Sequence, residues 1–472
     1  MRRPLAWYLK RLVVFLVLFV LTYGLGRLVV VWSDSQYDGV REPYLQSMSS
    51  QGVTLRWHTV EAARGVVRYG TAPDRLDAQV AEIGAVSDHH VRLTGLAPGT
   101  RYFYSVGTAD TVFRGGNDFW FITAPAWPST AAPGTPGDAV LPRRLWVTGD
   151  MGQPGEGQQA VARAARDWAR AHLRASPALY DAWLTTGDNA YRSGSMAQFQ
   201  AALFDPFADL LRNIPFWPAY GNHDARRWAF FELFDLPRRG EAGGVPSGSE
   251  HYFAFDNGPV HVVFVDTQEG DLSSDSAMLD WLVRDLAANQ RPWVIAVMHH
   301  PPYSRGSHDS DSPQDSGGRM WRVREQVVPL LERGGVDLVL SGHSHMYERS
   351  HLMACHYGDS QSWRPTLALQ GAVEGRYYRY LKRRTGAMPA GGGLDGTIYA
   401  VVGSSSRLDD GPLDHPAMAV SRHAMGSLLI DVDGQTLTAQ FIEHDGSIGD
   451  RFTIQKGRPE GPAPLVQCPP VP

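Results

Sequence analysis

Five short polar segments of the chain each follow an apolar run and carry residue types that bind metal ions. They are residues 149–152 (GDMG), 187–191 (GDNAY), 221–224 (GNHD), 299–301 (HHP) and 342–345 (GHSH). Together they offer carboxylate, phenol, amide and imidazole donors, which a pair of cations roughly 3.5–4 Å apart requires. Asp188 is the expected bridge between the two cations. Each segment alone is typical of a turn, but five in order predict a site for two metal ions.

The elements that must position these segments are strands and helices in alternation. Continuous apolar runs, typical of strands buried on both faces, precede the segments at residues 145–147, 182–184, 216–220, 294–298 and 338–340. Helical patterns cover residues 157–174 and 277–288. Alternating strands and helices gather their ligands at the carboxyl ends of the strands, so we expect the five segments to converge on one edge.

The order of the five segments resembles the signature of the calcineurin-like metallophosphoesterases. Tyr191 makes the purple acid phosphatase branch the better match, and the resemblance covers about residues 41–456. It implies an α/β catalytic domain with a four-layer αββα sandwich, preceded by a small all-β domain similar to fibronectin III. It also implies a dinuclear-metal phosphoester hydrolase in which a metal-bound hydroxide attacks phosphorus.

The resemblance also assigns the metal ligands. It gives the first metal, ferric iron in this branch, the ligands Asp150, Asp188, Tyr191 and His345. It gives the second metal, a divalent iron, zinc or manganese ion, the ligands Asp188, Asn222, His299 and His343. His300 stays open as an alternative to His299, because a Val-x-x-His spacing from Val297 selects it.

Three further residues near these segments are candidates for roles beyond metal binding. His223 resembles the histidine that contacts the substrate phosphate in this branch. His308 lies where members of the branch carry a histidine that protonates the leaving group, although the polar stretch at residues 304–318 also suits a solvated loop. Arg349 is either a phosphate contact or a partner in a structural ion pair.

The rest of the chain divides around the predicted catalytic domain at residues 143–456. Short alternating strands at residues 53–57, 65–69, 90–93 and 102–106 predict an all-β domain at residues 40–124. Residues 125–142, rich in Ala, Pro, Ser, Thr and Gly, are the expected linker, and residues 457–472 are a Pro-rich tail.

Residues 1–35 predict a membrane segment. Basic residues precede an apolar run at residues 12–32, and no small-residue cleavage site follows it. We favour an uncleaved signal anchor, a transmembrane helix that leaves the catalytic domain periplasmic or extracellular. The alternative is a secreted protein whose signal has been cleaved.

Composition constrains the partners. The chain has 472 residues and a formal net charge of −5, with both signs dispersed, which argues against a nucleic-acid-binding surface. Cys355 and Cys468, the two cysteines of the chain, either pair or stay free, and the oligomeric state is open. The expected substrate is a phosphorylated small molecule.

We therefore predict an acid phosphatase that acts on phosphomonoesters. A phosphodiesterase or nucleotidase that uses the same metals is the alternative, because substrate choice depends on loop shape. A membrane-tethered binding protein with structural metals is the third hypothesis.

Overall fold

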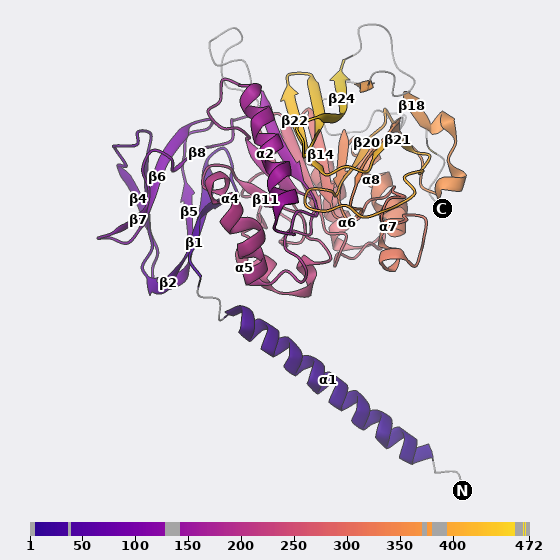
Figure 1. Ribbon diagram of the computed structural model, residues 1–472, viewed down its shortest axis with the longest axis horizontal. Helices are drawn as coiled ribbons and strands as arrows, with labels where there is room; N and C mark the ends of the chain where they lie inside the picture. The colour runs from indigo at the N-terminus through magenta and orange to yellow at the C-terminus, as the bar shows by residue number, and fades with distance from the viewer. Residues whose placement is uncertain are drawn as a thin grey trace.

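The computed structural model describes residues 5–35, 39–127, 142–370, 375–379, 394–457, 466 and 468. Most of the predicted linker and most of the predicted tail fall outside these ranges, so both stay predictions. Figure 1 shows an all-β domain beside a larger α/β body, with one long helix that leads away from them.

The all-β domain consists of two small antiparallel sheets. One sheet has the strand order β1-β2-β5. The other has the order β4-β3-β6-β7, and an additional strand, β8, pairs with β6. The strands are β1 (Arg41–Gln46), β2 (Gly52–Ala63), β3 (Val66–Gly70), β4 (Ala78–Ala81), β5 (Val86–Thr94), β6 (Arg101–Gly107), β7 (Val112–Arg114) and β8 (Trp120–Ile122). All four predicted strands are present.

This domain packs directly on the catalytic body. The Tyr44 hydroxyl donates to the Leu233 carbonyl at 2.7 Å, and the Thr54 hydroxyl donates to the Asp235 carboxylate at 2.8 Å. Both donors lie on the β1-β2-β5 sheet. The other sheet also contacts the catalytic domain, because the Tyr104 hydroxyl of β6 donates to the Arg212 carbonyl at 2.8 Å.

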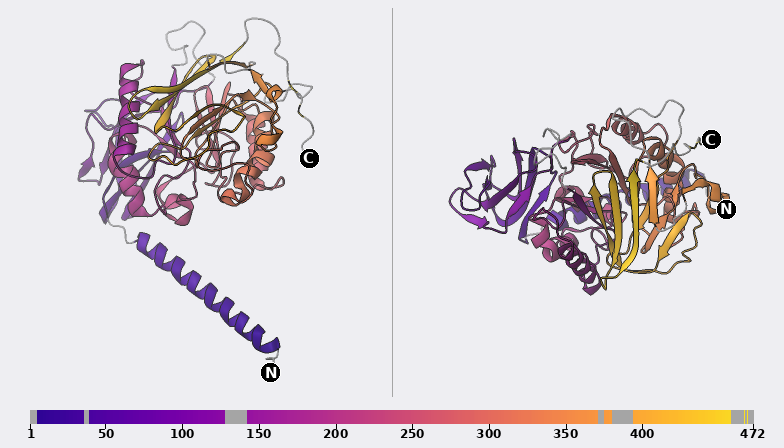
Figure 2. Two further views of the ribbon diagram at one scale, coloured as in Figure 1. Left: turned by 45° about the vertical axis from the view of Figure 1, so that its right-hand side comes forward. Right: turned by 90° about the horizontal axis from the view of Figure 1, so that it is seen from above.

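The catalytic body contains two seven-stranded sheets. The first has the order β11-β10-β9-β22-β23-β24-β19, and the second β12-β13-β14-β15-β20-β16-β21. Figure 2 shows β22, β23 and β24 side by side in the first sheet. The first sheet contains β9 (Arg143–Thr148), β10 (Ala182–Thr185), β11 (Phe216–Pro218), β19 (Arg376–Arg379), β22 (Gly426–Asp433), β23 (Thr436–Glu443) and β24 (Ile448–Lys456). The second contains β12 (Phe253–Asn257), β13 (Val260–Val265), β14 (Trp293–Met298), β15 (Leu338–Ser341), β16 (Tyr347–Ser350), β20 (Ile398–Val402) and β21 (Met418–Arg422).

The catalytic body also contains helices between its strands. They are α2 (Glu156–Ala171), α3 (Met196–Phe199), α4 (Asp205–Leu211), α5 (Ala229–Leu233), α6 (Ala277–Ala288), α7 (Arg319–Arg322) and α8 (Val328–Arg333). A further small pair of strands is formed by β17 (Leu352–Met353) and β18 (Ala368–Gln370). Helix α2 packs on β22 and β23, whereas α6 and α8 share a hydrophobic core with the second sheet.

Strand β14 shows why the apolar runs are continuous. Its alternate residues Trp293, Ile295 and Val297 belong to the core between the sheets. Those in between, Val294, Ala296 and Met298, belong to the core beneath the helices. Because side chains alternate across a strand, a strand covered on both faces must be apolar at every position.

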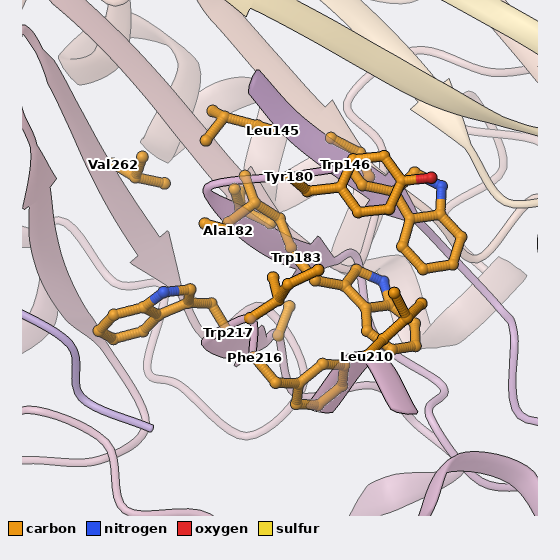
Figure 3. Close-up of a cluster of buried hydrophobic side chains, with 14 of the residues drawn as sticks. Leu145, Trp146, Tyr180, Ala182, Trp183, Leu210, Phe216, Trp217 and Val262 are labelled. Atoms are coloured by element: carbon orange, nitrogen blue, oxygen red, sulfur yellow. The ribbon is translucent and has the colours of Figure 1, made fainter. Parts of the chain in front are cut away.

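Aromatic packing fixes the strands that lead to the first polar segments. Trp146 of β9 stacks on Trp183 of β10 with ring centroids 4.4 Å apart, and Phe207 of α4 packs edge-on against Trp183 at 4.9 Å. Figure 3 shows this cluster, with Leu145 pointing away from Trp146 toward Val262 of the other sheet. The start of each ligand loop is therefore anchored in a rigid core.

The prediction of a membrane-spanning segment is wrong. Helix α1 (Leu5–Ser35) forms at the N-terminus, but no helix in the described ranges is long and apolar enough to cross a membrane. The apolar run that begins at Leu12 meets Arg27 before it reaches the about 20 residues that a spanning helix needs. The α/β sandwich behind an all-β domain fits the predicted fold class. The transmembrane helix that was part of that prediction is contradicted. The membrane-anchored localisation and the membrane partner were inferred from that segment and are corrected with it.

The two cysteines form a disulfide. Cys355 and Cys468 have Cα atoms 5.2 Å apart and are bonded through their sulfur atoms. The bond ties the end of the chain to the segment that follows β17.

Candidate metal centre

The five polar segments converge because their strands run in parallel. In the first sheet β9, β10 and β11 are parallel, and in the second β14 and β15 are parallel. Each segment follows the carboxyl end of one of these strands. The centre therefore lies where the carboxyl edges of the two sheets meet, with three of its loops from one sheet and two from the other.

Three of the predicted ligands have left-handed backbone conformations. Asp150, Asp188 and His343 have φ angles of +52°, +54° and +67°. An L-residue in this region costs roughly 1–2 kcal/mol, and such residues cluster where function requires a particular side-chain direction.

The loops also approach each other too closely for ordinary side chains. A Cβ atom on Gly221 would lie 2.2 Å from the Asp188 amide nitrogen, and one on Gly187 would lie 2.5 Å from Nδ1 of His299. Glycine at these positions lets the second and third segments pack backbone against backbone and lets the His299 ring approach Gly187.

One group of donors surrounds Tyr191. Its hydroxyl lies 3.2 Å from Oδ1 of Asp150 and 3.1 Å from Nε2 of His345. The same His345 nitrogen is 3.3 Å from Asp150 Oδ1. These three side chains, predicted as ligands of the first metal, thus point at a common position.

A second group surrounds Asn222. Its Oδ1 atom lies 2.9 Å from Nε2 of His299 and 3.0 Å from Nδ1 of His343. Asp188 approaches this group from the first sheet, with its Oδ1 atom 3.6 Å from His299 Nε2. Ligand atoms of Asp150, Asp188 and His299 all lie within 4.8 Å of one another, so Asp188 lies between the two groups.

The hydrogen bonds of the imidazoles test whether these residues fit metal ions. His299 Nδ1 lies 2.8 Å from the Thr186 carbonyl, and His345 Nδ1 lies 2.6 Å from Oδ2 of Asp409. Both Nδ1 atoms face oxygen acceptors and must donate. When the His299 ring is neutral, its Nε2 atom therefore carries the lone pair, and this atom faces the oxygen acceptors of Asn222 and Asp188. A cation between these facing acceptors would satisfy them, so the group around Asn222 fits a metal ion, and the carboxylate, phenol and imidazole around Tyr191 are residue types that fit another.

The pKa shifts of the buried groups agree with this fit. Burial lowers the pKa of His343 well below its ordinary value, and His300 and His299 lower it further, so the ring is neutral as a ligand must be. Burial raises the pKa of Tyr191 well above 10, and Asp150 and Asp188 add to this rise. The phenol therefore needs a nearby cation in order to ionise.

The pKa of His345 moves in the opposite direction. Burial alone would lower it, but the carboxylates of Asp150 and Asp409 outweigh burial and raise it. A cation bound at Nε2 would displace the proton that these carboxylates favour.

The adjacent residues His299 and His300 face different surroundings. His300 Nδ1 lies 3.0 Å from the Thr267 hydroxyl, which also accepts the His300 amide. Its ring packs at 4.5 Å from that of His343, whereas His299 reaches both Asn222 and Asp188. The choice of His299 as the ligand stays a prediction, and this geometry favours it.

Of the three other candidate residues, His223 and His308 lie near the centre, and Arg349 has a structural partner elsewhere. His223 packs edge-on against Tyr191 at 4.5 Å, its Nδ1 contacts the Arg192 carbonyl at 2.7 Å, and its Nε2 lies 3.8 Å from Asp188 Oδ2. His308 stacks on His343 with ring centroids 3.8 Å apart. Arg349, by contrast, forms a buried ion pair with Asp450 at 2.6 Å.

Sequence reasoning missed two carboxylates that hold the centre together. Asp224 is fully buried and accepts hydrogen bonds from the amides of Asn189 and Gly221, both at 3.0 Å, so it joins the second segment to the third. Asp224 is the last residue of the GNHD segment, so the motif could have indicated its importance from the sequence. Asp409 orients His345 from 64 residues further along the chain, and no local pattern marks it.

Comparisons with known proteins agree with this architecture. Residues 143–347 match the calcineurin-like phosphoesterase family, and residues 42–123 match the N-terminal domain of purple acid phosphatases. Purple acid phosphatase 22 of Arabidopsis thaliana is 27% identical over 311 residues, which cover 60% of this chain and 60% of that protein. Human acid phosphatase type 7 is 28% identical over 330 residues, which cover 63% of this chain and 67% of that protein.

A solved structure shares the fold. The purple acid phosphatase PPD1 from yellow lupin seeds aligns with a TM-score of 0.64 at 18% identity, over 89% of this chain and 75% of that one. Fold, donor set and family matches all define a metallophosphoesterase with an all-β domain in front of it. The chain therefore combines a calcineurin-like phosphoesterase domain with a domain that matches the N-terminal domain of purple acid phosphatases, and purple acid phosphatases are among its relatives. The match spans about 60% of the length of the first curated relatives.

Proposed function

We propose that this protein is a metal-dependent phosphatase that hydrolyses phosphomonoesters at a dinuclear centre. The observation that carries the proposal is the set of oxygen and nitrogen atoms suited to metal binding that face one another around Tyr191 and Asn222. The names of the relatives in Arabidopsis and human, both acid phosphatases, support the same activity.

The ligand assignment follows the two donor groups. Asp150, Tyr191 and His345 would hold the first cation, Asn222, His299 and His343 the second, and Asp188 both. We propose ferric iron for the first position, because a phenol with a raised pKa suits a trivalent cation, and divalent iron, zinc or manganese for the second. When bound, the two cations would activate a water nucleophile and polarise the phosphoryl oxygen.

Two histidines of the chain would act on the substrate itself. His223 donates through Nδ1 to the Arg192 carbonyl, so a protonated His223 ring would present its Nε2 proton to the substrate phosphate. His308 donates through Nδ1 to Asp315 at 2.8 Å, so its Nε2 atom can hold the proton that the leaving oxygen needs.

The test is hydrolysis of p-nitrophenyl phosphate and bis(p-nitrophenyl) phosphate by the purified chain, with metal content measured on the same sample. We expect two metals per chain and faster turnover of the monoester. Faster turnover of the diester would favour the phosphodiesterase or nucleotidase alternative. Two bound metals without hydrolysis of either compound would favour a binding protein with structural metals.

Asp188→Asn tests the bridging role of Asp188 in the same assay. The substitution keeps the volume of the side chain and removes the charge on which both cations depend. We expect both metal content and hydrolysis to fall almost completely, and near-normal values for both would refute the assignment of Asp188 as the bridge.

A further inference from the structure

A run of three left-handed residues lies beside the metal centre. Ser316, Gly317 and Gly318, in the 3-10 turn Asp315–Gly318, have φ angles of +51°, +63° and +73°. Glycine adopts this conformation without strain, but serine does so at a cost of roughly 1 kcal/mol or more. A turn alone would be served better by a third glycine, so the serine side chain needs a separate explanation.

The Ser316 hydroxyl joins a carboxylate to an imidazole. Its Oγ atom lies 2.7 Å from Oδ1 of Asp315 and 2.6 Å from Nε2 of His343. A hydroxyl has one proton, and an ionised carboxylate can only accept, so the hydroxyl donates to Asp315 and accepts from His343.

This arrangement fixes the tautomer of His343. If Nε2 donates its proton to Ser316, the lone pair of the neutral ring is on Nδ1. That nitrogen lies 3.0 Å from Asn222 Oδ1, in the second donor group. A partner on the far nitrogen both orients a ligand histidine and raises its affinity for the metal.

The same carboxylate also holds His308. Asp315 Oδ1 accepts from His308 Nδ1 at 2.8 Å, and the His308 ring stacks on His343 with centroids 3.8 Å apart and planes 19° apart. Asp315 Oδ2 accepts the Asp309 amide at 2.8 Å, which fixes the carboxylate itself. One side chain thus determines the positions of two neighbouring imidazoles.

We propose that Asp315 and Ser316 are a positioning pair that sets the tautomer of His343 for metal binding and holds His308 against the His343 ring. This inference rests on the proposed dinuclear hydrolase. It gives the polar loop at residues 304–318 a definite role, because the loop links the second metal position to the group that protonates the leaving oxygen.

Ser316→Gly tests the pair without damaging the turn. Glycine removes the hydroxyl and relieves the left-handed strain, so the full-length variant should unfold at an unchanged or higher temperature. We expect its apparent affinity for the second metal, measured by competition with a chelator and by metal analysis, to fall about 10–100-fold. The first metal should stay bound.

Ser47→Gly is the matched control. Ser47 has a φ angle of +45°, lies in the all-β domain and bonds through its hydroxyl to the Asp235 carbonyl. It shares the backbone conformation of Ser316 and contacts no predicted ligand. We expect Ser47→Gly to leave the affinity for both metals unchanged.

Asp315→Asn separates the two roles of the carboxylate. At saturating metal, Ser316→Gly should recover most of its kcat, whereas Asp315→Asn should not, because the amide lacks the negative charge that strengthens the hydrogen bond to His308 and favours its protonated ring. Full recovery of kcat by Asp315→Asn would refute the role toward His308. Unchanged affinity of Ser316→Gly for the second metal would refute the role toward His343. If the unmodified chain itself failed to bind two metals, the proposed function would fail instead.

Discussion

Glu348 makes the stability of this protein depend on pH in a way that can be calculated from the structure. Its side chain is fully buried in β16, where Oε2 accepts a hydrogen bond from the Ser304 hydroxyl. Its other oxygen, Oε1, is buried without a hydrogen-bond partner among the described residues. Burial raises the pKa of Glu348 from 4.5 to about 7, and the hydrogen bonds from Ser304 and the Arg305 amide offset only part of the rise.

The sign of the effect follows from the two pKa values. Between pH 4.5 and 7 the folded state binds a proton that the unfolded state has released, so stability falls as the pH rises. The contribution is fully present below pH 4.5 and is lost as the pH passes through about 7. A shift of this size corresponds to about 3 kcal/mol of unfolding free energy.

The perturbation is Glu348→Gln, which keeps the shape and removes the titration. We expect the variant to match the parent at pH 4.5 and to be more stable by up to about 3 kcal/mol at pH 7.5. Urea unfolding at several pH values measures the difference. Glu332, whose pKa burial also raises to about 7, contributes equally to both proteins and cancels.

Glu156→Gln is the control, because the Glu156 side chain is 85% exposed. Its unfolding curve should follow that of the parent at every pH. If the curves of Glu348→Gln and the parent also stayed parallel from pH 4.5 to 7.5, the raised pKa would be refuted. A confirmed effect would show that ionisation of Glu348 destabilises the fold beneath Ser304, where the loop that carries His308 begins.

Three further predictions concern the metal ligands. His299→Ala should lose the second metal, whereas His300→Ala should retain most of it, because only His299 reaches Asn222 and Asp188; greater metal loss from His300→Ala, by metal analysis, would reverse the assignment. Tyr191→Phe should remove a visible absorption band from protein loaded with ferric iron, and a parent that is colourless with ferric iron bound would exclude tyrosinate ligation. Asp409→Asn should weaken the first metal about 10–100-fold in a chelator competition, because the acceptor that orients the ring of His345 is impaired, and unchanged affinity would make that contact incidental.

The sequence by itself determined which chemistry is available and where in the fold it lies. Strands such as β14 are apolar at every position because they are covered on both faces, and this pattern is local and readable. Parallel strands present their carboxyl ends at one edge, so the polar segments that follow them had to converge. The donor types were therefore predictable together with their approximate position.

Hydropathy at the N-terminus was a weaker guide. A basic segment followed by an apolar run predicted a membrane anchor, but α1 does not meet the requirement of length and apolarity.

Only the tertiary structure decided which atoms face one another. Adjacent residues such as His299 and His300 leave the end of a strand in different directions, and packing alone determines which of them reaches Asn222. Contacts such as Asp409 with His345, or Cys355 with Cys468, join positions that are 64 and 113 residues apart. Ser316 meets His343 only because a loop folds back in a left-handed turn. Such contacts depend on the path of the whole chain, and a local pattern of residue types contains no information about that path.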